Sequence, residues 1–264
     1  MQTTEPPALL AALEAVAPLA LAEPWDNVGL LVDPPTPRPL RRVLLTIDLT
    51  EAVLQEALST EADFIVAYHP PIFQPLKRLA MADARQRVLL GAIAAGLPIY
   101  SPHTALDAAA GGVNDWLLGA FGDLAAVRPI TPAKVDPRVG AGRLATLATP
   151  RRLEALLPDI KRWLGLAHVR VATADGRLIH TVAVCPGAGG SLLEGVQGSD
   201  LLLTGELRHH DVLSHTARGA AVVLTDHTHT ERGYLVHLAA RLAAHLPDLV
   251  FQTSAMDADP LVVQ

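Results

Sequence analysis

Short apolar runs alternate with longer amphipathic segments along most of the chain. Strand-like runs lie at residues 42–48, 64–67, 97–100, 144–147, 169–173, 181–184, 201–204 and 220–224. Helical periodicity covers residues 7–17, 51–59, 77–96, 150–164 and 233–246. Strands that alternate with helices of this length are typical of βα units in a parallel sheet. The pattern therefore predicts an α/β protein.

The order of strands and helices occurs twice, which indicates a duplicated α/β unit. Residues 62–70 and 199–207 share a small residue, an aspartate, an apolar strand and polar residues at its end. Residues 103–107 and 227–231 align in the same way, with His103 on His227. Residues 121–137 contain several prolines and few periodic apolar positions. We therefore expect two similar α/β domains, residues 1–127 and 128–264, with layered sheets and helices.

Imidazole and carboxylate side chains follow the ends of the predicted strands. His227 and Glu231 are four residues apart, and His103 and Asp107 repeat this spacing. His69 precedes two prolines in a stiff loop. Nitrogen and oxygen ligands of this kind suit zinc, iron or manganese. Because sites assemble at the carboxyl ends of such strands, the sequence predicts a divalent-metal site at these strand ends.

Other polar stretches near the strand ends are open to more than one interpretation. Glu206 and His209 follow the strand at 201–204, and we expect one or the other either to support a metal ligand or to act as an acid–base group. Residues 187–190 form a glycine-rich loop that either cradles an anion or makes a tight strand-to-helix turn. Residues 25–29 contain Trp, Asp, Asn and Gly and either form a turn or lie beside the site.

Composition and charge exclude several classes of function. The net charge is −6, and only three of the 21 basic residues are lysines, so no basic face is available for a nucleic-acid polymer. The single cysteine, Cys185, excludes an internal disulfide and agrees with a reducing compartment. No apolar run reaches membrane-spanning length. We therefore expect a soluble cytoplasmic protein that binds neither nucleic-acid polymers nor membranes.

Five motifs occur in an order that resembles one protein family. They are EPWDNVGL at 23–30, HPPIF at 69–73, HTALD at 103–107, TGE at 204–206 and HTHTE at 227–231. The chain resembles the hexameric dinuclear-metal-centre proteins known as GTP cyclohydrolase 1 type 2 homologues. The resemblance covers nearly the whole chain. It implies two similar α/β domains, a ring-shaped homohexamer and a two-metal site between the domains.

The resemblance also implies a set of ligands. His69 and Asp107 match the ligands of one metal, His227 matches a ligand of the other, and Glu231 matches the carboxylate that bridges both. The family usually has a second histidine just before the first, where this chain has Tyr68. We therefore expect one or two divalent ions per subunit, with Tyr68 as a phenolate ligand if it binds at all. His103 or His229 are the other candidates for the missing ligand.

The function implied by this resemblance is that of a metal-dependent hydrolase, with the purine ring of GTP as the suggested substrate. The metal would activate water, and Glu206, His209 or His103 would transfer protons. Two alternatives stay open, a metal-dependent phosphoesterase and a non-catalytic metal-binding ring-shaped scaffold. The expected partners are a small-molecule substrate such as a nucleotide, and other copies of the same chain.

Overall fold

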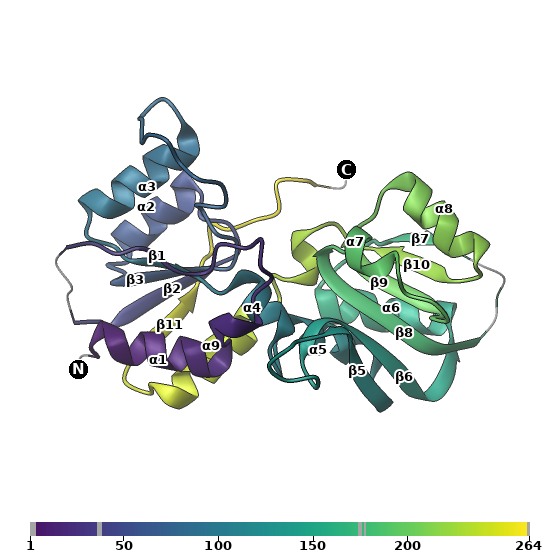
Figure 1. Ribbon diagram of the computed structural model, residues 1–264. Helices are drawn as coiled ribbons and strands as arrows, with labels where there is room; N and C mark the ends of the chain where they lie inside the picture. Colours follow the sequence, from purple (N-terminus) through teal and green to yellow (C-terminus); the bar gives the residue numbers. More distant parts are fainter. Residues whose placement is uncertain (1–3, 36–38, 174–175, 177, 263–264) are drawn as a thin grey trace. The chain divides into compact units, whose positions relative to one another are not determined.

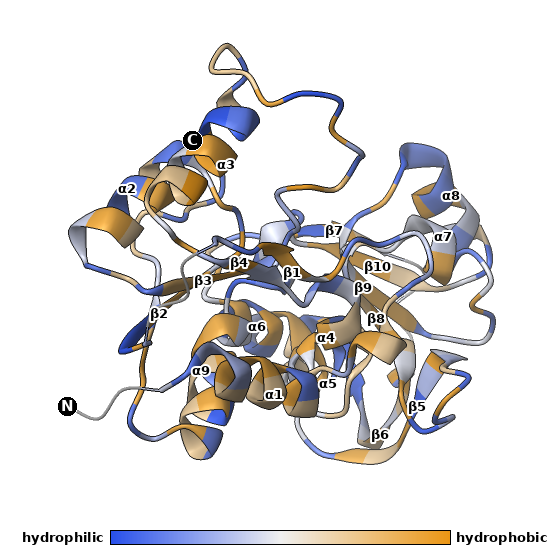
Figure 2. Ribbon diagram, turned by 60° about the vertical axis from the view of Figure 1, so that its left-hand side comes forward, coloured by the Kyte–Doolittle hydropathy of each residue, from blue (hydrophilic) through white to orange (hydrophobic). Residues whose placement is uncertain are grey.

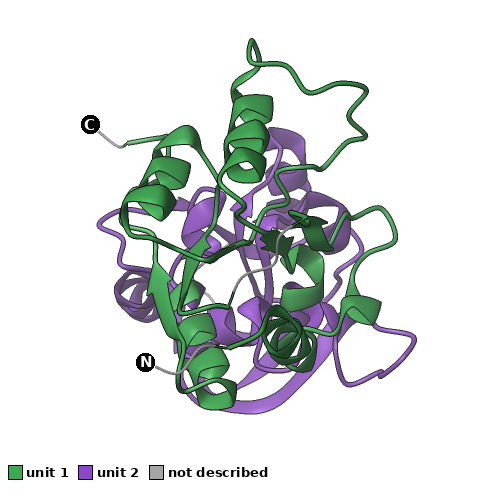
Figure 3. Cartoon of the chain, turned by 90° about the vertical axis from the view of Figure 1, so that its left-hand side faces the viewer, with its two compact units in different colours: residues 1–106, 235–264 green, residues 107–234 purple. Residues whose placement is uncertain are grey.

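The computed structural model describes residues 4–35, 39–173, 176 and 178–262, and the chain forms two compact units. Unit 1 comprises Met1–Leu106 and Leu235–Gln264, and unit 2 comprises Asp107–Tyr234 (Figure 3). This division differs from the expected domains at 1–127 and 128–264. Residues 124–132, where we expected a junction, form an edge strand of the unit 2 sheet. The last strand of the chain returns to the sheet of unit 1.

Unit 1 contains a five-stranded sheet with the order β1-β4-β3-β2-β11 (Figure 1). Its strands are β1 (Gly29–Val32), β2 (Arg42–Thr46), β3 (Phe64–Ala67), β4 (Ile99–Ser101) and β11 (Val250–Thr253). Strands β4, β3, β2 and β11 run parallel, and β1 is antiparallel to β4. All four residues of β3 are buried, as a continuous apolar run in a central parallel strand predicts.

The helices of unit 1 cover both faces of this sheet. They are α1 (Pro6–Val16), α2 (Glu51–Ser59), α3 (Ala84–Ala94), α9 (Tyr234–His245) and the short η1 (Leu19–Leu21), while α4 (His103–Ala108) spans the boundary between the units. Helices α2 and α3 lie on one face, and α1 and α9 lie on the other (Figure 1). Figure 2 shows both hydrophobic and hydrophilic residues on α2 and α3, as expected for helices with one buried face.

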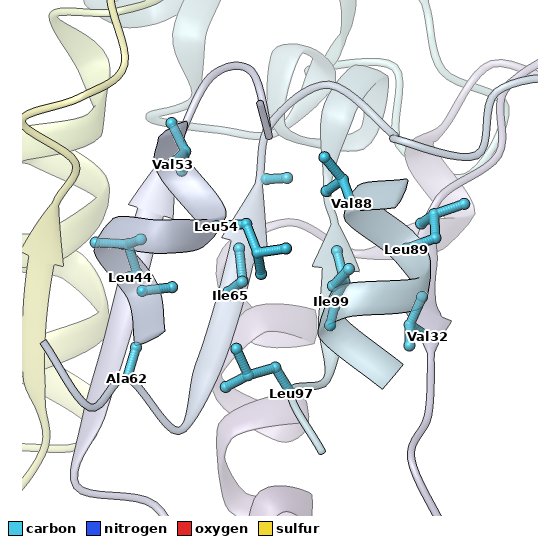
Figure 4. Packing of buried hydrophobic residues seen from close by; sticks show 13 residues of the cluster. Val32, Leu44, Val53, Leu54, Ala62, Ile65, Val88, Leu89, Leu97 and Ile99 are labelled. Atoms are coloured by element: carbon cyan, nitrogen blue, oxygen red, sulfur yellow. The ribbon is translucent and has the colours of Figure 1, made fainter. Parts of the chain in front are cut away.

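The core between the sheet and helices α2 and α3 is made of aliphatic side chains (Figure 4). Thr50 begins α2, because its hydroxyl accepts a hydrogen bond from the N–H group of Val53 at 3.3 Å. The periodicity predicted a helix from Lys77, but helix α3 begins only at residue 84. The Asp83 side chain accepts a hydrogen bond from the N–H group of Gln86 at 3.0 Å and so caps the helix there.

Unit 2 contains a six-stranded sheet with the order β5-β6-β8-β9-β10-β7. Its strands are β5 (Leu124–Pro132), β6 (Gly140–Arg152), β7 (Arg170–Ala172), β8 (Leu178–Ala188), β9 (Leu201–Glu206) and β10 (Ala221–Leu224). Strands β8, β9 and β10 run parallel, and the other pairings are antiparallel. Leu193 and Val212, from the helices that follow β8 and β9, pack on Ala183, Leu202 and Val222 of this sheet.

The helical segments of unit 2 range from single turns to the 12 residues of α6. They are α5 (Val113–Leu118), η2 (Gly119–Phe121), α6 (Leu153–Leu164), α7 (Gly190–Leu193), α8 (His209–Ala217) and η3 (Thr228–Thr230). In the part of the chain that the structure describes, no helix of either unit is long and apolar enough to cross a membrane.

The two sheets share one topology over four strands. The order β1-β4-β3-β2 in unit 1 corresponds to β7-β10-β9-β8 in unit 2, an antiparallel edge strand followed by three parallel strands. Helices α2 and α3 connect the parallel strands of unit 1, and α7 and α8 connect those of unit 2. The duplicated α/β unit that the sequence predicts is therefore confirmed.

An aspartate clasp recurs at the same place in both units. One carboxylate oxygen of Asp63, just before β3, accepts hydrogen bonds from two successive backbone N–H groups at the start of β2. Asp200, just before β9, does the same at β8. The donors are Arg41 and Arg42 in unit 1, and His180 and Thr181 in unit 2, at 2.8–3.1 Å. The aspartate shared by 62–70 and 199–207 therefore joins neighbouring strands.

Strand pairing corrects one detail of the internal alignment. Ile65 pairs with Ile99, and the equivalent Leu202 pairs with Val222. Counting on from these pairs makes His103 equivalent to Asp226, whereas the sequence alignment places it on His227. The structure supports this register, because His103 and Asp226 both have positive φ angles, 25° and 64°. The repeated His-Thr dipeptide shifted the alignment by one residue.

We predict that Asp63→Ala and Asp200→Ala each lower the free energy of unfolding by about 2–4 kcal/mol. Each substitution removes a carboxylate that accepts charge-assisted hydrogen bonds and leaves two backbone donors without it. Urea denaturation of the intact chain measures the effect. Asp248→Ala, at an exposed position, is the matched control and should stay within about 0.5 kcal/mol of the parent. Equal stability of Asp63→Ala and the control would contradict the clasp.

Candidate metal centre

In unit 2, His227 lies between two carboxylates at the carboxyl edge of the sheet. Glu206 is the last residue of β9, and its Oε1 atom lies 3.2 Å from Nδ1 of His227. Glu231 places Oε1 at 3.5 Å from Nε2 of the same ring. A carboxylate on one ring nitrogen fixes the orientation of an imidazole and raises its basicity. Nε2 of His227 is therefore the candidate ligand atom, beside Glu231.

The His227–Glu231 pair forms across a 3₁₀ turn that precedes helix α9. Element η3 occupies residues 228–230, and α9 begins only at residue 234. Asp226, with φ of 64°, turns the chain sharply after β10. Only 3% of the Glu231 side chain is exposed. A buried carboxylate beside an imidazole is the arrangement that a divalent cation stabilises.

Two threonine hydroxyls fix the glycine loop against this pair. Thr230 Oγ1 accepts a hydrogen bond from the N–H of Gly187 and donates to the carbonyl of His227, both at 2.7 Å. Thr204 Oγ1 accepts from the N–H of Gly189 at 3.2 Å and donates to the carbonyl of Gly187 at 3.1 Å. These loop N–H groups are therefore engaged internally, and the tight-turn interpretation describes the loop better than the anion cradle does.

Gly187 faces both candidate ligand atoms. Its φ is +59°, and a Cβ atom at this position would lie 2.7 Å from Glu231 Oε1 and 2.8 Å from His227 Nε2. A side chain would occupy the space that these two atoms border. Because glycine has no side chain, this space stays open. The oxygen and nitrogen donors that border it suit a small cation.

The backbone around Asp107 is held by buried polar side chains of unit 2. Nδ2 of Asn114 donates to the carbonyl of Asp107 at 3.0 Å, and only 1% of Asn114 is exposed. The guanidinium of Arg143, whose side chain is 2% exposed, donates to the carbonyls of Ala108 and Ala109 at 3.3 Å. These contacts fix the end of α4, where Asp107 is half-buried.

The carboxylates of Asp107 and Glu231, both in unit 2, influence the thiol of Cys185. Burial raises the pKa of its thiol, and the negative charges of Asp107 and Glu231 raise that pKa further. Asp107 and Glu231 therefore both lie close enough to Cys185 to influence its thiol. Because the thiolate is the ligand form of cysteine, the raised pKa disfavours Cys185 as a ligand.

In unit 1, His69 is oriented by a carboxylate that the sequence analysis missed. Nδ1 of His69 lies 2.9 Å from Oδ1 of Asp48. Asp48 follows β2 and His69 follows β3, so the pair forms at the carboxyl edge of adjacent parallel strands. Nε2 is then the candidate ligand atom of His69. The signal for Asp48 was its place just after a strand that neighbours β3.

His103 is paired with a buried aspartate in the same unit. Its Nδ1 atom lies 2.8 Å from Oδ1 of Asp26, whose side chain is fully buried. The backbone N–H and the hydroxyl of Thr104 also donate to Asp26. Burial alone raises the pKa of Asp26, but the hydrogen bonds from His103 and Thr104 outweigh it and leave that pKa below its ordinary value. Asp26 therefore stays ionised and orients His103, so residues 25–29 do more than form a turn.

The remaining candidates occupy different environments. Tyr68 is 2% exposed, with its ring centroid 5.0 Å from that of His69. His209 is exposed at the start of α8, and its ring lies beside His210. His229 places Nδ1 at 2.7 Å from the carbonyl of Thr225. The roles predicted for these three side chains therefore stay predictions.

His69, His227 and Glu231 each offer one ligand atom and are the candidate metal-binding group among the described residues. The group contains two imidazoles and one carboxylate, a donor set typical of zinc, iron or manganese. The sequence analysis named all three residues, but it did not recognise that Thr230 and Gly187 contact each other beside His227 and Glu231. These contacts join residues far apart in the sequence, so no local pattern indicated them.

Comparison with known proteins identifies the family. The profile of Duf34/NIF3 (NGG1p interacting factor 3) matches residues 7–260. NIF3-like protein 1 of Drosophila melanogaster is 42% identical over 261 residues, covering 97% of this chain and 88% of that protein. Protein NIF3 homolog of Schizosaccharomyces pombe is 43% identical over 263 residues, covering 94% of each.

Solved structures agree with this assignment at the level of the fold. The crystal structure of a Bacillus cereus protein related to NIF3 has a TM-score of 0.89 at 20% identity, and the similarity covers 100% of both chains. This similarity confirms the α/β fold. The family resemblance seen in the sequence motifs is confirmed as well, because GTP cyclohydrolase 1 type 2 homologue is another name for the same family. The chain belongs to the DUF34/NIF3 family.

Proposed function

We propose that this protein is a metal-dependent hydrolase in which His69, Asp107, His227 and Glu231 hold one or two divalent ions per subunit. The observation that carries the proposal is the buried Glu231 carboxylate beside Nε2 of His227, with the space at Gly187 bordered by both. The donor set suits zinc, iron or manganese. A divalent ion held there would supply hydroxide near neutral pH and polarise the bond under attack.

The side chains around the proposed ligands have distinct tasks. Glu206 orients His227, and Asp48 orients His69, each through Nδ1. These carboxylates keep both imidazoles in the tautomer that presents Nε2 as the ligand atom. His103, held at Nδ1 by Asp26, presents Nε2 for proton transfer to the leaving group. We assign this step first to His103, and then to Glu206 and His209.

GTP is the substrate that the family's other name suggests. Opening its purine ring adds water at the carbon between the two imidazole nitrogens and breaks a carbon–nitrogen bond. A second water then releases formate. Metal-activated hydroxide and a group that protonates the leaving nitrogen are the requirements of this chemistry. We further propose that the enzyme works in the reducing cytoplasm, in agreement with its single cysteine.

A non-catalytic scaffold is the second candidate, because the family description names an interaction, that of NGG1p interacting factor 3. In this case the metal stabilises the protein and no substrate is turned over. Both candidates include a homohexamer, which light scattering would detect as a mass six times the 27.9 kDa of one chain. A monomer in solution would contradict the ring. The phosphoesterase alternative loses support, because the loop N–H groups of Gly187 and Gly189 are engaged internally.

We predict that the purified protein contains divalent metal, and that metal-loaded protein releases formate from GTP. Glu231→Gln should weaken metal binding by at least tenfold to a hundredfold and abolish formate release, because it removes a buried anionic ligand. Elemental analysis gives the metal per chain, and a formate assay gives turnover. Glu194→Gln, an exposed carboxylate in the same unit, should match the parent in both measurements.

Each outcome of this experiment selects one interpretation. If the protein contains metal but does not turn over GTP, then GTP is not its substrate. If metal removal also changes the melting temperature or assembly while no substrate of a small panel reacts, the scaffold is supported and the hydrolase is wrong. Full metal content in Glu231→Gln would remove Glu231 from the ligand set.

We also predict that Gly187→Ala lowers metal affinity at least tenfold. The new Cβ atom would meet Glu231 and His227 at 2.7–2.8 Å and displace both ligand atoms. Gly165→Ala is the matched control, because Gly165 also has a positive φ of +70° but has nothing within 4 Å of the added atom. It shares the cost of backbone strain and lacks the collision. Metal titration of both variants tests this, and equal affinities would show that Gly187 does not border the site.

A further inference from the structure

Aromatic rings are scarce in this chain, and several of them gather at one place in unit 1. The sequence has only ten Phe, Trp and Tyr residues. Trp25, Tyr68 and Phe73 form a ring cluster with His69 and His103, in which neighbouring ring centroids lie 5.0–6.4 Å apart. The ring cluster lies where β3 and β4 end, beside a proposed metal ligand.

The ring cluster has a buried base and an exposed edge. Tyr68 is 2% exposed, whereas Trp25 is 60% and Phe73 is 45% exposed. The rings of Trp25 and Phe73 have centroids 6.0 Å apart and planes inclined by 69°. We call this exposed pair the aromatic corner. The two rings meet edge to face and both are partly exposed, so aromatic surface of each stays available to a ligand.

Local contacts hold the aromatic corner in place. Nδ2 of Asn27 donates to the carbonyl of Ile72 at 2.5 Å and so ties the loop of Trp25 to the loop of Phe73. Both exposed rings also pack edge to face on the ring of His103, with centroids 6.2 and 6.4 Å away. A large apolar pair that is exposed and fixed by a hydrogen bond between loops is typical of a binding surface.

We propose that the aromatic corner binds the purine base of the substrate, with the base stacked on one ring and its edge against the other. This inference rests on the proposed hydrolase and deepens it by assigning a base-binding site. Flat rings are favoured over aliphatic chains, because the surface offers two exposed aromatic rings whose planes are inclined by 69°. A cation is disfavoured, because Asp26, which follows Trp25 in the chain, is a buried carboxylate already engaged by His103 and Thr104.

The position of the aromatic corner agrees with the proposed chemistry. Trp25 and Phe73 both contact His103, the side chain to which we assign proton transfer. The centroid of the His103 ring lies 5.4 Å from that of His69. A base stacked on the corner would therefore place its ring atoms beside the group that moves protons and beside a proposed metal ligand.

GMP and ribose 5-phosphate, which differ in the base, test the proposal by calorimetry on the metal-loaded full chain. The parent should bind GMP at least tenfold more tightly than ribose 5-phosphate. Trp25→Leu keeps the apolar bulk but removes the π-face, and should weaken GMP binding about tenfold to a hundredfold, the range expected for one stacked base. Trp25→Phe should retain binding within about threefold, and Leu79→Ala, 44% exposed outside the ring cluster, should match the parent.

Three results would overturn the proposal. They are equal binding of GMP and ribose 5-phosphate by the parent, equal GMP affinity of Trp25→Leu and the parent, and an equal loss in Trp25→Leu and Trp25→Phe. A change of molecular mass in Trp25→Leu, measured by light scattering, would instead assign the corner to a subunit contact and also overturn it. Base-dependent binding without formate release would remove the hydrolase and leave the base site, so the two failures are distinguishable. Metal content should be unchanged in every Trp25 variant.

Discussion

Parallel strands bring their carboxyl ends to one edge of a sheet, and the polar chemistry of this protein depends on that constraint. In unit 1 the edge gathers Asp48 and His69, from residues that follow adjacent strands. In unit 2 it gathers Glu206 and His227 in the same way. Neither pair is close in sequence. Each exists because apolar strands pair in register and the aspartate clasps at Asp63 and Asp200 fix where the pairing begins.

The two copies of the α/β unit place different side chains with different roles at equivalent strand-end positions. Counting from the paired strands, His69 of unit 1 is equivalent to Glu206 of unit 2, and Asp48 is equivalent to Gly187. Unit 1 thus has an imidazole oriented by an aspartate. Unit 2 has a carboxylate that orients the next imidazole along the edge, and a glycine that leaves space in front of it. Duplication supplied the framework, and divergence at a few positions supplied different donors.

How far the sequence predicts this structure depends on the range of the interactions involved. The strand at 64–67 and the helix at 51–59 were predicted correctly, because burial and helical periodicity act over a few residues. Strand β5 was missed, since an edge strand with exposed residues has little apolar alternation. The partnership of Asp48 with His69 was missed, because it depends on strand pairing across 21 residues. The candidate ligands were found from their spacing and their places after predicted strands, and the order of motifs in a family then implied their roles.

Tyr68, the departure from the family pattern, has a physical explanation in the same register. Its equivalent in unit 2 is Gly205, where an added Cβ would lie 2.7 Å from the carbonyl oxygen of Gly187 and 2.8 Å from Cα of His227. In unit 2, therefore, this position allows backbones to approach. In unit 1 the same position carries a buried ring against His69 and His103. Such a placement favours a packing role for Tyr68, whose buried ring contacts both imidazoles. A histidine at this position would add a metal-ligand atom but would make less apolar contact with the other rings. Tyrosine in place of histidine therefore removes one possible ligand and packs the ring cluster more tightly.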